Sequence, residues 1–304
     1  LIRRKNMERL KNKKSDKIVL GLPKGSLQKT TFRIFEKAGF NISVGERSYY
    51  PSINDPEIEC VLLKPQEIGR YIEDGVLDVG ITGLDWVKET NANVTEIEDL
   101  LFGKVRKNPV KWVLAVANES KIKKPEDLNG KIIATEMINT VKKYLKKKKI
   151  KAKIEFSWGA TEVKARGLAD AIVDVTETGS SLLAHNLRVI DTLQESSTRI
   201  FANKNAMKNK WKQKKIREIA MLIKGVIVAE SKVEMLMNVP KKCLESVIKI
   251  LPALNTPTIS QLSEDGWYDV MTIVDKKIVK NLIPKLKDAG AEGIVEVPIN
   301  RIID

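Results

Sequence analysis

The sequence predicts an α/β protein with two similar lobes, followed by a smaller C-terminal βαββαβ module. Short β-branched runs alternate with helical stretches from Lys17 to Val175, a rhythm typical of strands covered by helices. Two segments, LDVGITGLDW and DAIVDVTETGSSL, share the order apolar strand, glycine-containing turn and helix. From about Gly225 the pattern of apolar residues changes. The last ~75 residues follow the order βαββαβ, which is the ferredoxin-like arrangement.

The first lobe begins with the strand KIVLGLP and a helix from about Leu27 to Ala38. The strand IECVLL, a helix across PQEIGRYIEDG and the strand LDVGITG follow. The second lobe begins at KWVLAVA (111–117) and continues through the PEDL helix start, KIIAT, a basic helix, KIEFSW, a helix across TEVKARGLA, and DAIVDV. Both glycine turns should therefore lie at carboxyl ends of strands, where open α/β sheets bind ligands. A ligand held between the lobes would meet both turns.

The C-terminal part follows a helical stretch that should end at about Lys224. Its expected elements are the strand KVEMLMNV, the helix KKCLESVIKIL, the strands TISQL and WYDVMTIV, the helix KKIVKNLIPKLKDAG and the strand GIVEVPINRII. The predicted division of the chain is a basic N-terminal tail, lobe I in two pieces, lobe II and the C-terminal domain: 1–16; 17–108 and 204–230; 109–203; 231–304.

Composition restricts the class of protein. The chain has 304 residues, of which 42% are apolar, and this is enough for real cores in two or three domains. No apolar run approaches the ~18 residues of a membrane span, and the basic N-terminal segment lacks the apolar core of a signal peptide. We therefore expect a cytoplasmic protein without a membrane partner. Cys60 and Cys243 have neither metal-type spacing nor a nearby histidine, so both are expected to be small core residues.

The net charge of +15 suggests nucleic acid, an anionic membrane or small polyanionic substrates as partners. Lysines are densest in KKYLKKKKIKAK (142–153) and KNKWKQKK (208–215), and such runs are usually solvated helix faces. Only 5% of the residues are aromatic, and they do not alternate with basic residues as they do in proteins that stack bases. The residues therefore give a nucleic-acid partner only weak support, and we expect none.

The stretch DVTETGSSL concentrates hydroxyl and backbone N–H donors after a strand. Thr176, Thr178, Ser180 and Ser181 surround Gly179, and N–H groups at a helix start carry partial positive charge. A phosphate is the anion that best fits such a turn. The alternative is an ordinary strand-to-helix turn in which Thr or Ser serves as the N-cap, and the residues alone leave both open.

Several motifs together resemble ATP phosphoribosyltransferase of the long, regulated form. They are LPKGSL (22–27), RSYYPSINDPEIECVLLKPQEIGRYIEDGVLDVGITGLDW (47–86), PVKWVLAV (109–116), GLADAIVDVTETGSSLLAHNL (167–187), LPALNTPTISQLSEDGWYDV and AGAEGIVEVPI. The resemblance runs from about Lys17 to the C-terminus. It implies two periplasmic-binding-protein-like α/β lobes plus a C-terminal ferredoxin-like (ACT-like) βαββαβ domain. The family joins ATP to phosphoribosyl pyrophosphate in the first step of histidine biosynthesis, with magnesium.

The resemblance implies a set of site residues. The segment from Asp174 to Ser181 would hold the 5′-phosphate and ribose of phosphoribosyl pyrophosphate, with Ser181 where relatives often have Thr. The implied catalytic residues are Lys24, Arg47, Glu162 and Asp174; the phosphoribosyl pyrophosphate loop is Asp174, Thr176, Glu177, Thr178, Gly179, Ser180 and Ser181; the nucleotide site is Thr82, Gly83 and Asp85. Magnesium would be held mainly by substrate phosphates, with Glu162 and Asp174 as candidate ligands. Relatives often carry Arg at the position of Tyr50, so one expected cation is missing.

The alternative reading of each residue stays open. Lys24 also suits a solvated turn, while Asp85 and Glu162 also suit the first turn of a helix. The single histidine, His185, is expected to be a surface or packing residue. The expected chemistry needs no general base, because adenine N1 is already a neutral nucleophile and magnesium pyrophosphate is the leaving group. Positioning and charge neutralisation would then carry catalysis.

The resemblance also implies a regulatory C-terminal domain that binds histidine as a feedback inhibitor between subunits. Its ligand-contacting positions would be Asn238, Leu254, Thr256 and Thr258, although LNTPT also suits an ordinary strand-connecting loop. The expected assembly is a homo-oligomer, a hexamer in equilibrium with a dimer. The main alternative function is a two-lobed anion- or solute-binding protein without catalysis. A nucleic-acid-binding protein and an inactive regulatory subunit are further alternatives.

Overall fold

The computed structural model describes residues 17–46, 48–100, 109–252 and 256–303. The chain divides into two compact units. The first comprises Leu1–Arg33 and Phe40–Ala220, and the second comprises Ile34–Gly39 and Met221–Asp304. The basic tail, 1–16, lies outside the described residues. No helix among the described residues is long and apolar enough to cross a membrane.

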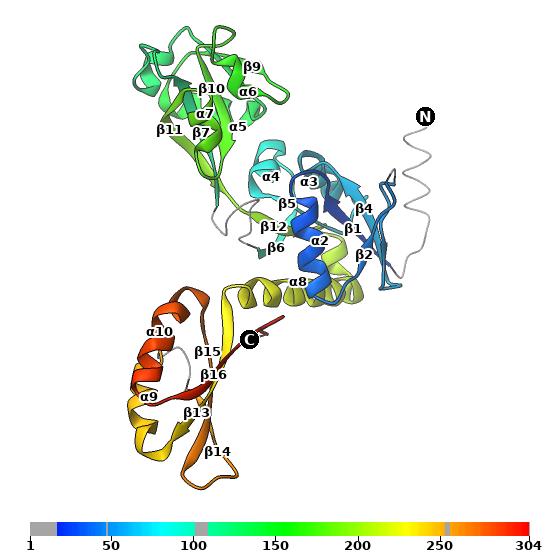
Figure 1. Ribbon diagram of the computed structural model, residues 1–304. Coiled ribbons are helices and arrows are strands. Elements are labelled where there is room, and N and C mark those ends of the chain that lie inside the picture. The colour runs from blue at the N-terminus through cyan, green and yellow to red at the C-terminus, as the bar shows by residue number, and fades with distance from the viewer. Residues whose placement is uncertain (1–16, 47, 101–108, 253–255, 304) are drawn as a thin grey trace. The chain divides into compact units, whose positions relative to one another are not determined.

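The first sheet of unit 1 has five strands in the order β4-β1-β5-β12-β6. The strands are β1 (Ile18–Pro23), β4 (Ile58–Leu63), β5 (Val79–Gly83), β6 (Thr95–Asp99) and β12 (Thr198–Ala202). Strand β1 pairs in parallel with β4 and β5, whereas β12 is antiparallel to both of its neighbours. The associated helices are α2 (Gln28–Lys37), α3 (Pro65–Glu73) and α4 (Leu84–Thr90). Alternating apolar residues of these strands pack against α3 and α4, so strand ends and helix starts converge at one edge (Figure 1).

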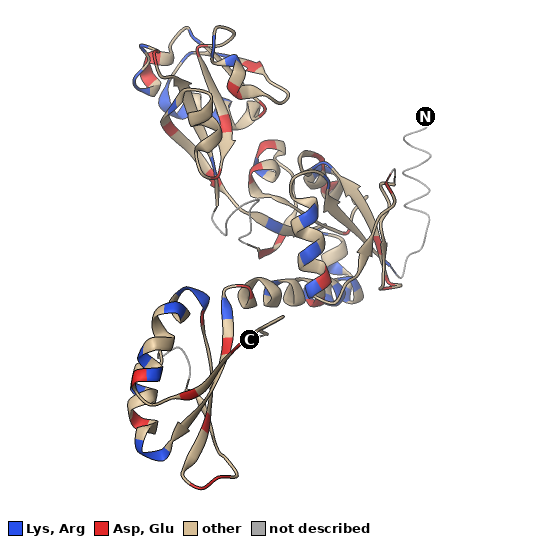
Figure 2. Ribbon diagram, in the orientation of Figure 1, with Lys and Arg blue, Asp and Glu red and all other residues tan. Residues whose placement is uncertain are grey.

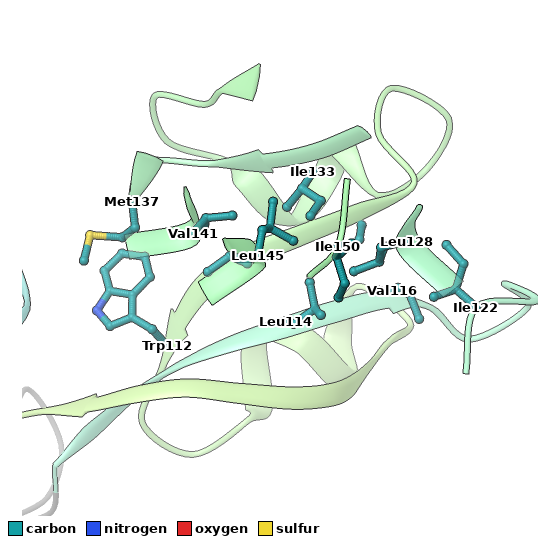
Figure 3. Packing of buried hydrophobic residues seen from close by; sticks show 12 residues of the cluster. Trp112, Leu114, Val116, Ile122, Leu128, Ile133, Met137, Val141, Leu145 and Ile150 are labelled. Atoms are coloured by element: carbon teal, nitrogen blue, oxygen red, sulfur yellow. The ribbon is translucent and has the colours of Figure 1, made fainter. Parts of the chain in front are cut away.

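The second sheet of unit 1 has the order β11-β7-β10-β8-β9. Its strands are β7 (Val110–Ala117), β8 (Ile132–Thr135), β9 (Lys153–Phe156), β10 (Ala171–Thr176) and β11 (Leu187–Ser196). Its helices are the 3-10 turn Pro125–Leu128, α5 (Ile138–Lys148), α6 (Thr161–Lys164) and α7 (Ser180–Ala184). Val141 and Leu145, one helical turn apart on α5, insert between Trp112 and Leu114 of β7 and Ile133 of β8 (Figure 3). This core fixes the strand ends that carry the polar turns.

Unit 2 contains a four-stranded antiparallel sheet in the order β14-β15-β13-β16. Its elements are α8 (Lys210–Ala229, which begins in unit 1), β13 (Lys232–Pro240), a 3-10 turn Lys241–Cys243, α9 (Leu244–Ile250), β14 (Thr258–Gln261), β15 (Trp267–Asp275), α10 (Lys276–Asp288) and β16 (Glu292–Pro298). In this βαββαβ order the first strand lies between the third and the fourth, which is the ferredoxin-like topology. The predicted fold class, two α/β lobes and a ferredoxin-like module, is confirmed.

Some local predictions were wrong. Helix α8 continues past Gly225 to Ala229. A Cβ at Gly225 would lie 2.8 Å from the Ile302 carbonyl oxygen. That glycine permits close packing inside a helix and does not end it. The PEDL segment forms only a 3-10 turn, and α6 is limited to four residues. The short hairpin of β2 (Ile42–Ser43) and β3 (Ser52–Ile53), the strands β11 and β12, and the 3-10 turn Ala206–Lys208 had not been predicted.

Lysines and arginines are spread over many elements (Figure 2), and α5 carries five lysines among its eleven residues. They recur along α2, α8 and α10. Cys60 is buried and Cys243 is half-buried, and both are free thiols. His185, whose Nδ1 lies 2.9 Å from the Ser181 carbonyl oxygen, caps the end of α7.

Candidate functional site

A cleft of 610 Å³ opens within unit 1, and strand ends of both sheets line it. The turn after β1, the starts of α3 and α4, the first residues of β7, and the ends of β8, β9 and β10 all contribute. The lining residues are Lys24, Ser26, Leu27, Lys64, Pro65, Gln66, Gly83, Asp85, Trp86, Val110, Trp112, Glu136, Trp158, Gly159, Asp174, Val175, Thr176, Glu177, Ser196, Ser197 and Thr198. Its volume lies in the usual range for small-molecule sites.

The hydroxyl-rich turn that the sequence singled out follows β10. Gly179 has φ +80°, in the left-handed region that favours glycine, and its N–H donates to the Thr176 hydroxyl at 2.8 Å. The hydroxyls of Thr178 and Ser180 lie 2.9 Å apart and are exposed. The donors are therefore the backbone and hydroxyls of the turn itself. The five-residue helix α7 adds little dipole, which the sequence analysis had not anticipated.

Three carboxylates lie close to this turn. Asp174 of β10 follows the last residue that pairs with β8, and Glu136 follows the corresponding end of β8. Burial raises the pKa of Asp174 from 3.8 to about 6; a hydrogen bond from the Val175 N–H opposes the rise, while the charges of Glu162 and Glu136 add to it. The pKa of Glu162 is lowered, chiefly by a 2.6 Å hydrogen bond from the Ser181 hydroxyl. The pKa of Asp174 is thus raised mainly by burial, and the negative charges beside it act in the same direction.

Lysines and aromatic rings face the same cleft. Lys24 places its Nζ 3.7 Å from the centre of the Tyr49 ring, and Lys64 places its Nζ 4.5 Å from the centre of the Trp158 ring. Trp158 is 67% exposed although it lines the cleft, so its indole is open to a ligand. Tyr50 lines a separate hollow of 310 Å³.

Asp85 lies at the start of α4 and is 5% exposed. Its carboxylate accepts hydrogen bonds from Trp112 Nε1 at 2.7 Å and from the Trp86 N–H at 3.0 Å. Burial raises its pKa, and these hydrogen bonds partly offset the rise. Thr82 is fully buried and its hydroxyl donates to the Pro65 carbonyl at 2.7 Å. The nucleotide-binding role of both residues stays a prediction, as does that of Gly83, which lines the cleft.

A second carboxylate of α4 joins it to the other sheet. Glu89, 8% exposed, accepts 2.8 Å hydrogen bonds from the N–H groups of Asn139 and Thr140 and from the Thr140 hydroxyl. Its backbone carbonyl also accepts from the Asn139 amide at 3.0 Å. This carboxylate therefore caps the N-terminus of α5, where helical N–H groups lack partners.

The structure brings together six of the predicted catalytic-unit residues as cleft lining: Lys24, Gly83, Asp85, Asp174, Thr176 and Glu177. Glu162 is hydrogen-bonded to Ser181, and neither residue lines the cleft; the same holds for Thr82, Thr178, Gly179 and Ser180. Arg47 and Leu254 lie outside the described residues. Sequence reasoning missed Lys64, Glu136 and Trp158, although each follows a strand, so the strand-end rule could have found them.

The predicted regulatory residues all belong to unit 2. Asn238 is exposed on β13, opposite Asp269 of β15 and Glu292 of β16. Thr258 begins β14 and is exposed, as is Thr256 before it. Their role in binding histidine stays a prediction.

Comparison with known families identifies the chain. Residues 64–225 match the family model described as ATP phosphoribosyltransferase, and residues 229–301 match the model of the HisG C-terminal domain. The chain belongs to the ATP phosphoribosyltransferase family. The predicted family is thus confirmed, and the alternative of a solute-binding protein without catalysis is not favoured.

Curated members of the ATP phosphoribosyltransferase family match almost the whole chain. The protein from Thermodesulfovibrio yellowstonii is 56% identical over 95% of this chain and 99% of its own length. The protein from Chlorobaculum parvum is 53% identical over 94% of this chain and 97% of its own. Among solved structures, the ATP phosphoribosyl transferase (HisG:HisZ) complex from Thermotoga maritima superposes with a TM-score of 0.58 and 26% identity, over 68% of this chain and 98% of that chain.

Proposed function

We propose that the cleft of unit 1 is the active site of ATP phosphoribosyl transfer. The observation that carries the proposal is that the hydroxyl-rich turn after β10 opens beside a cleft that strand ends of both sheets line. Thr178, Ser180 and Ser181 would give hydroxyl donors to the 5′-phosphate of phosphoribosyl pyrophosphate, and Gly179 would let the phosphate approach the backbone. Asp174 would accept hydrogen bonds from the ribose hydroxyls.

The proposed reaction is a displacement at the anomeric carbon. Adenine N1 of ATP forms the new bond to that carbon, and the bond to pyrophosphate breaks with its electron pair leaving on pyrophosphate. N1 is already a neutral nucleophile, so no side chain has to remove a proton first. The lysines of the cleft, Lys24 and Lys64, would offset the charge of the departing pyrophosphate. The remaining contribution of the protein is alignment of N1 with the anomeric carbon.

We propose Mg²⁺ as the cofactor. Magnesium is usually bound through one or two carboxylates together with substrate phosphates and water. Among the described residues no group of three or more His, Cys, Asp or Glu side chains could hold a metal. Asp174, with Glu162 and Glu136 close enough to shift its pKa, offers the few oxygen ligands that such a shared site needs. The metal would neutralise phosphate charge.

For unit 2 we propose a regulatory role. Histidine would bind at Asn238, Thr256 and Thr258, together with Leu254, and would inhibit the enzyme. The assembly we propose is a homo-oligomer, hexameric in equilibrium with a dimer; the HisG:HisZ complex of the Thermotoga maritima relative supports association between chains in general. The cytoplasmic location stays a prediction.

The test of the catalytic proposal is pyrophosphate release when ATP, phosphoribosyl pyrophosphate and Mg²⁺ are mixed with the full chain. Release should need both substrates and should stop when Mg²⁺ is chelated. The loop is tested with Gly179→Val, which should raise the KM for phosphoribosyl pyrophosphate by about 100-fold or more, because a branched side chain distorts a left-handed turn and blocks the approach.

A matched control separates binding from backbone strain. Gly130 has φ +73° and open space around its Cβ position, as Gly179 does, but it lies just before β8 and not in the turn after β10. Gly130→Val therefore carries a similar strain and should keep a near-normal KM for both substrates. If the two variants lose activity alike, or if Gly179→Val keeps its KM, the turn is not the phosphate site.

A further inference from the structure

A second hollow of unit 1 is strongly basic. It has a volume of 480 Å³ and lies where α4, α5 and β11 meet. We call it the junction pocket, and the residues that matter for its chemistry are Lys88, Thr140, Lys143, Lys147, Lys148 and Asp191. It shares no lining residue with the substrate cleft. It is therefore a separate place for a ligand.

The positive charge of the junction pocket is only partly neutralised. Asp191 is its one carboxylate, and it already accepts a 2.5 Å hydrogen bond from Tyr144 and pairs with Lys148 at 3.3 Å. Among the described residues the side chain of Lys143 reaches one partner, the neutral Asn91 side chain at 2.6 Å. The side chains of Lys88 and Lys147 have no hydrogen bond or ion pair within the same part of the chain. Four lysines against one aspartate leave three positive charges in one hollow.

Only some lysines of α5 line the junction pocket. The sequence run 142–153 was expected to be a solvated helix face. On α5, however, Lys143 and Lys147 are four residues apart and turn to the pocket, where Lys88 of α4 meets them, whereas Lys142 and Lys146 do not line it. Like charges at this spacing destabilise a helix. An anion bound between α4 and α5 would offset the repulsion among these lysines.

We propose that the junction pocket is a second anion site that binds a di- or triphosphate. A compact ligand with several negative charges matches three uncompensated ammonium groups, and 480 Å³ has room for more than one phosphate group. Inorganic polyphosphate and the phosphate chain of a nucleotide share this chemistry. Thr140 lines the pocket and also donates to Glu89, so the bound anion contacts the joint between the two sheets of unit 1.

The test measures binding of inorganic tripolyphosphate to the full chain by calorimetry, without Mg²⁺. The pocket variant is Lys143→Gln/Lys147→Gln. The control variant is Lys142→Gln/Lys146→Gln, which removes the same charge at the same spacing from the same helix but not from the pocket. The pocket variant should weaken one of two binding events by about tenfold or more, and the control should stay within about twofold. All four lysines are exposed, so both variants should fold, which their Tm values check.

Two further measurements identify where the anion binds and which ligand is preferred. Lys24→Gln, which changes the cleft, should leave the event lost in the pocket variant intact. Titration with ATP in place of tripolyphosphate shows whether a nucleoside adds affinity at the same event. If the pocket and control variants weaken binding equally, the attraction is diffuse and the proposal is overturned. A single event that only Lys24→Gln removes overturns it as well, because all binding then occurs in the cleft.

Discussion

Asp174→Asn should make the protein more stable at neutral pH while it lowers activity. Asp174 lies at the end of β10, where burial and the nearby charges of Glu162 and Glu136 raise its pKa from 3.8 to about 6. A pKa difference of this size corresponds to about 3 kcal/mol between the protonated and ionised forms. Partial exposure of the side chain screens its charge, so this value is an upper limit.

The sign follows from proton binding. The folded protein holds the Asp174 proton more tightly than the unfolded chain does, so folding stability falls as pH rises from about 4 to about 6. Above pH 6 both states are ionised and the full penalty is present; below the unfolded pKa it vanishes. Asparagine carries no charge at any pH. The variant should therefore gain up to about 3 kcal/mol at pH 7.5, and this gain should shrink as the pH falls toward 4.

Urea unfolding at several pH values between 4.5 and 7.5 measures this gain as a shift of the midpoint. Asp191→Asn is the opposite case. At Asp191 partial burial favours a higher pKa, but the Tyr144 hydrogen bond and Lys148 outweigh it and lower the pKa, so its replacement should reduce stability at pH 7.5. The reasoning is refuted if Asp174→Asn loses stability at pH 7.5, or if its gain is the same at pH 4.5. Turnover by Asp174→Asn should fall at least tenfold if the carboxylate orients the ribose.

Three further predictions follow from other contacts. Glu89→Gln should lower the free energy of unfolding by about 2 to 3 kcal/mol in urea unfolding, because the NH2 group of the glutamine would face the N–H donors of α5. The control Glu73→Ala removes an exposed carboxylate and should change the free energy of unfolding by less than about 0.5 kcal/mol. His185→Asn should keep most of the turnover and the same pH profile between about 6 and 8, and a 100-fold loss in a folded variant would contradict catalysis by positioning. Thr258→Trp, at an exposed position, should abolish inhibition by histidine in initial-rate measurements at saturating substrates; equal inhibition of both proteins would exclude the proposed histidine site.

The sequence predicted those parts of the fold whose pattern is local. Strand β1 is an almost continuous apolar run and β10 begins with three apolar residues, and the positions of both strands agree with the prediction. Strand β11 was missed because its pairing with β7 is irregular at two points, between Val189 and Asp191 and between Thr192 and Gln194. Each irregularity shifts the side-chain alternation by one residue and removes the period of two that identifies a half-buried strand.

The candidate site also has parts that the sequence could predict and parts that it could not. The turn around Gly179 could be found from its residue types alone, since hydroxyls and a glycine in one turn have a direct chemical meaning. The surroundings of Asp85 could not, because its partner Trp112 lies 27 residues away and in the other sheet. The sequence interpretation of a carboxylate at a helix start was accurate for its position, but its hydrogen bonds depend on tertiary packing.

Helix α4 links the candidate cleft to the contacts between the two sheets of unit 1. Asp85 and Glu89 are four residues apart, so both carboxylates leave the same face of α4. Asp85 accepts a hydrogen bond from Trp112 of β7, and Glu89 caps α5. The seven-residue helix α4, which packs on the first sheet, therefore contacts two elements that belong to the second. Gly83, Asp85 and Trp86 at the beginning of this helix also line the cleft. If the proposed substrate displaces the start of α4, the contacts of Asp85 with Trp112 and of Glu89 with α5 must therefore strain or rearrange.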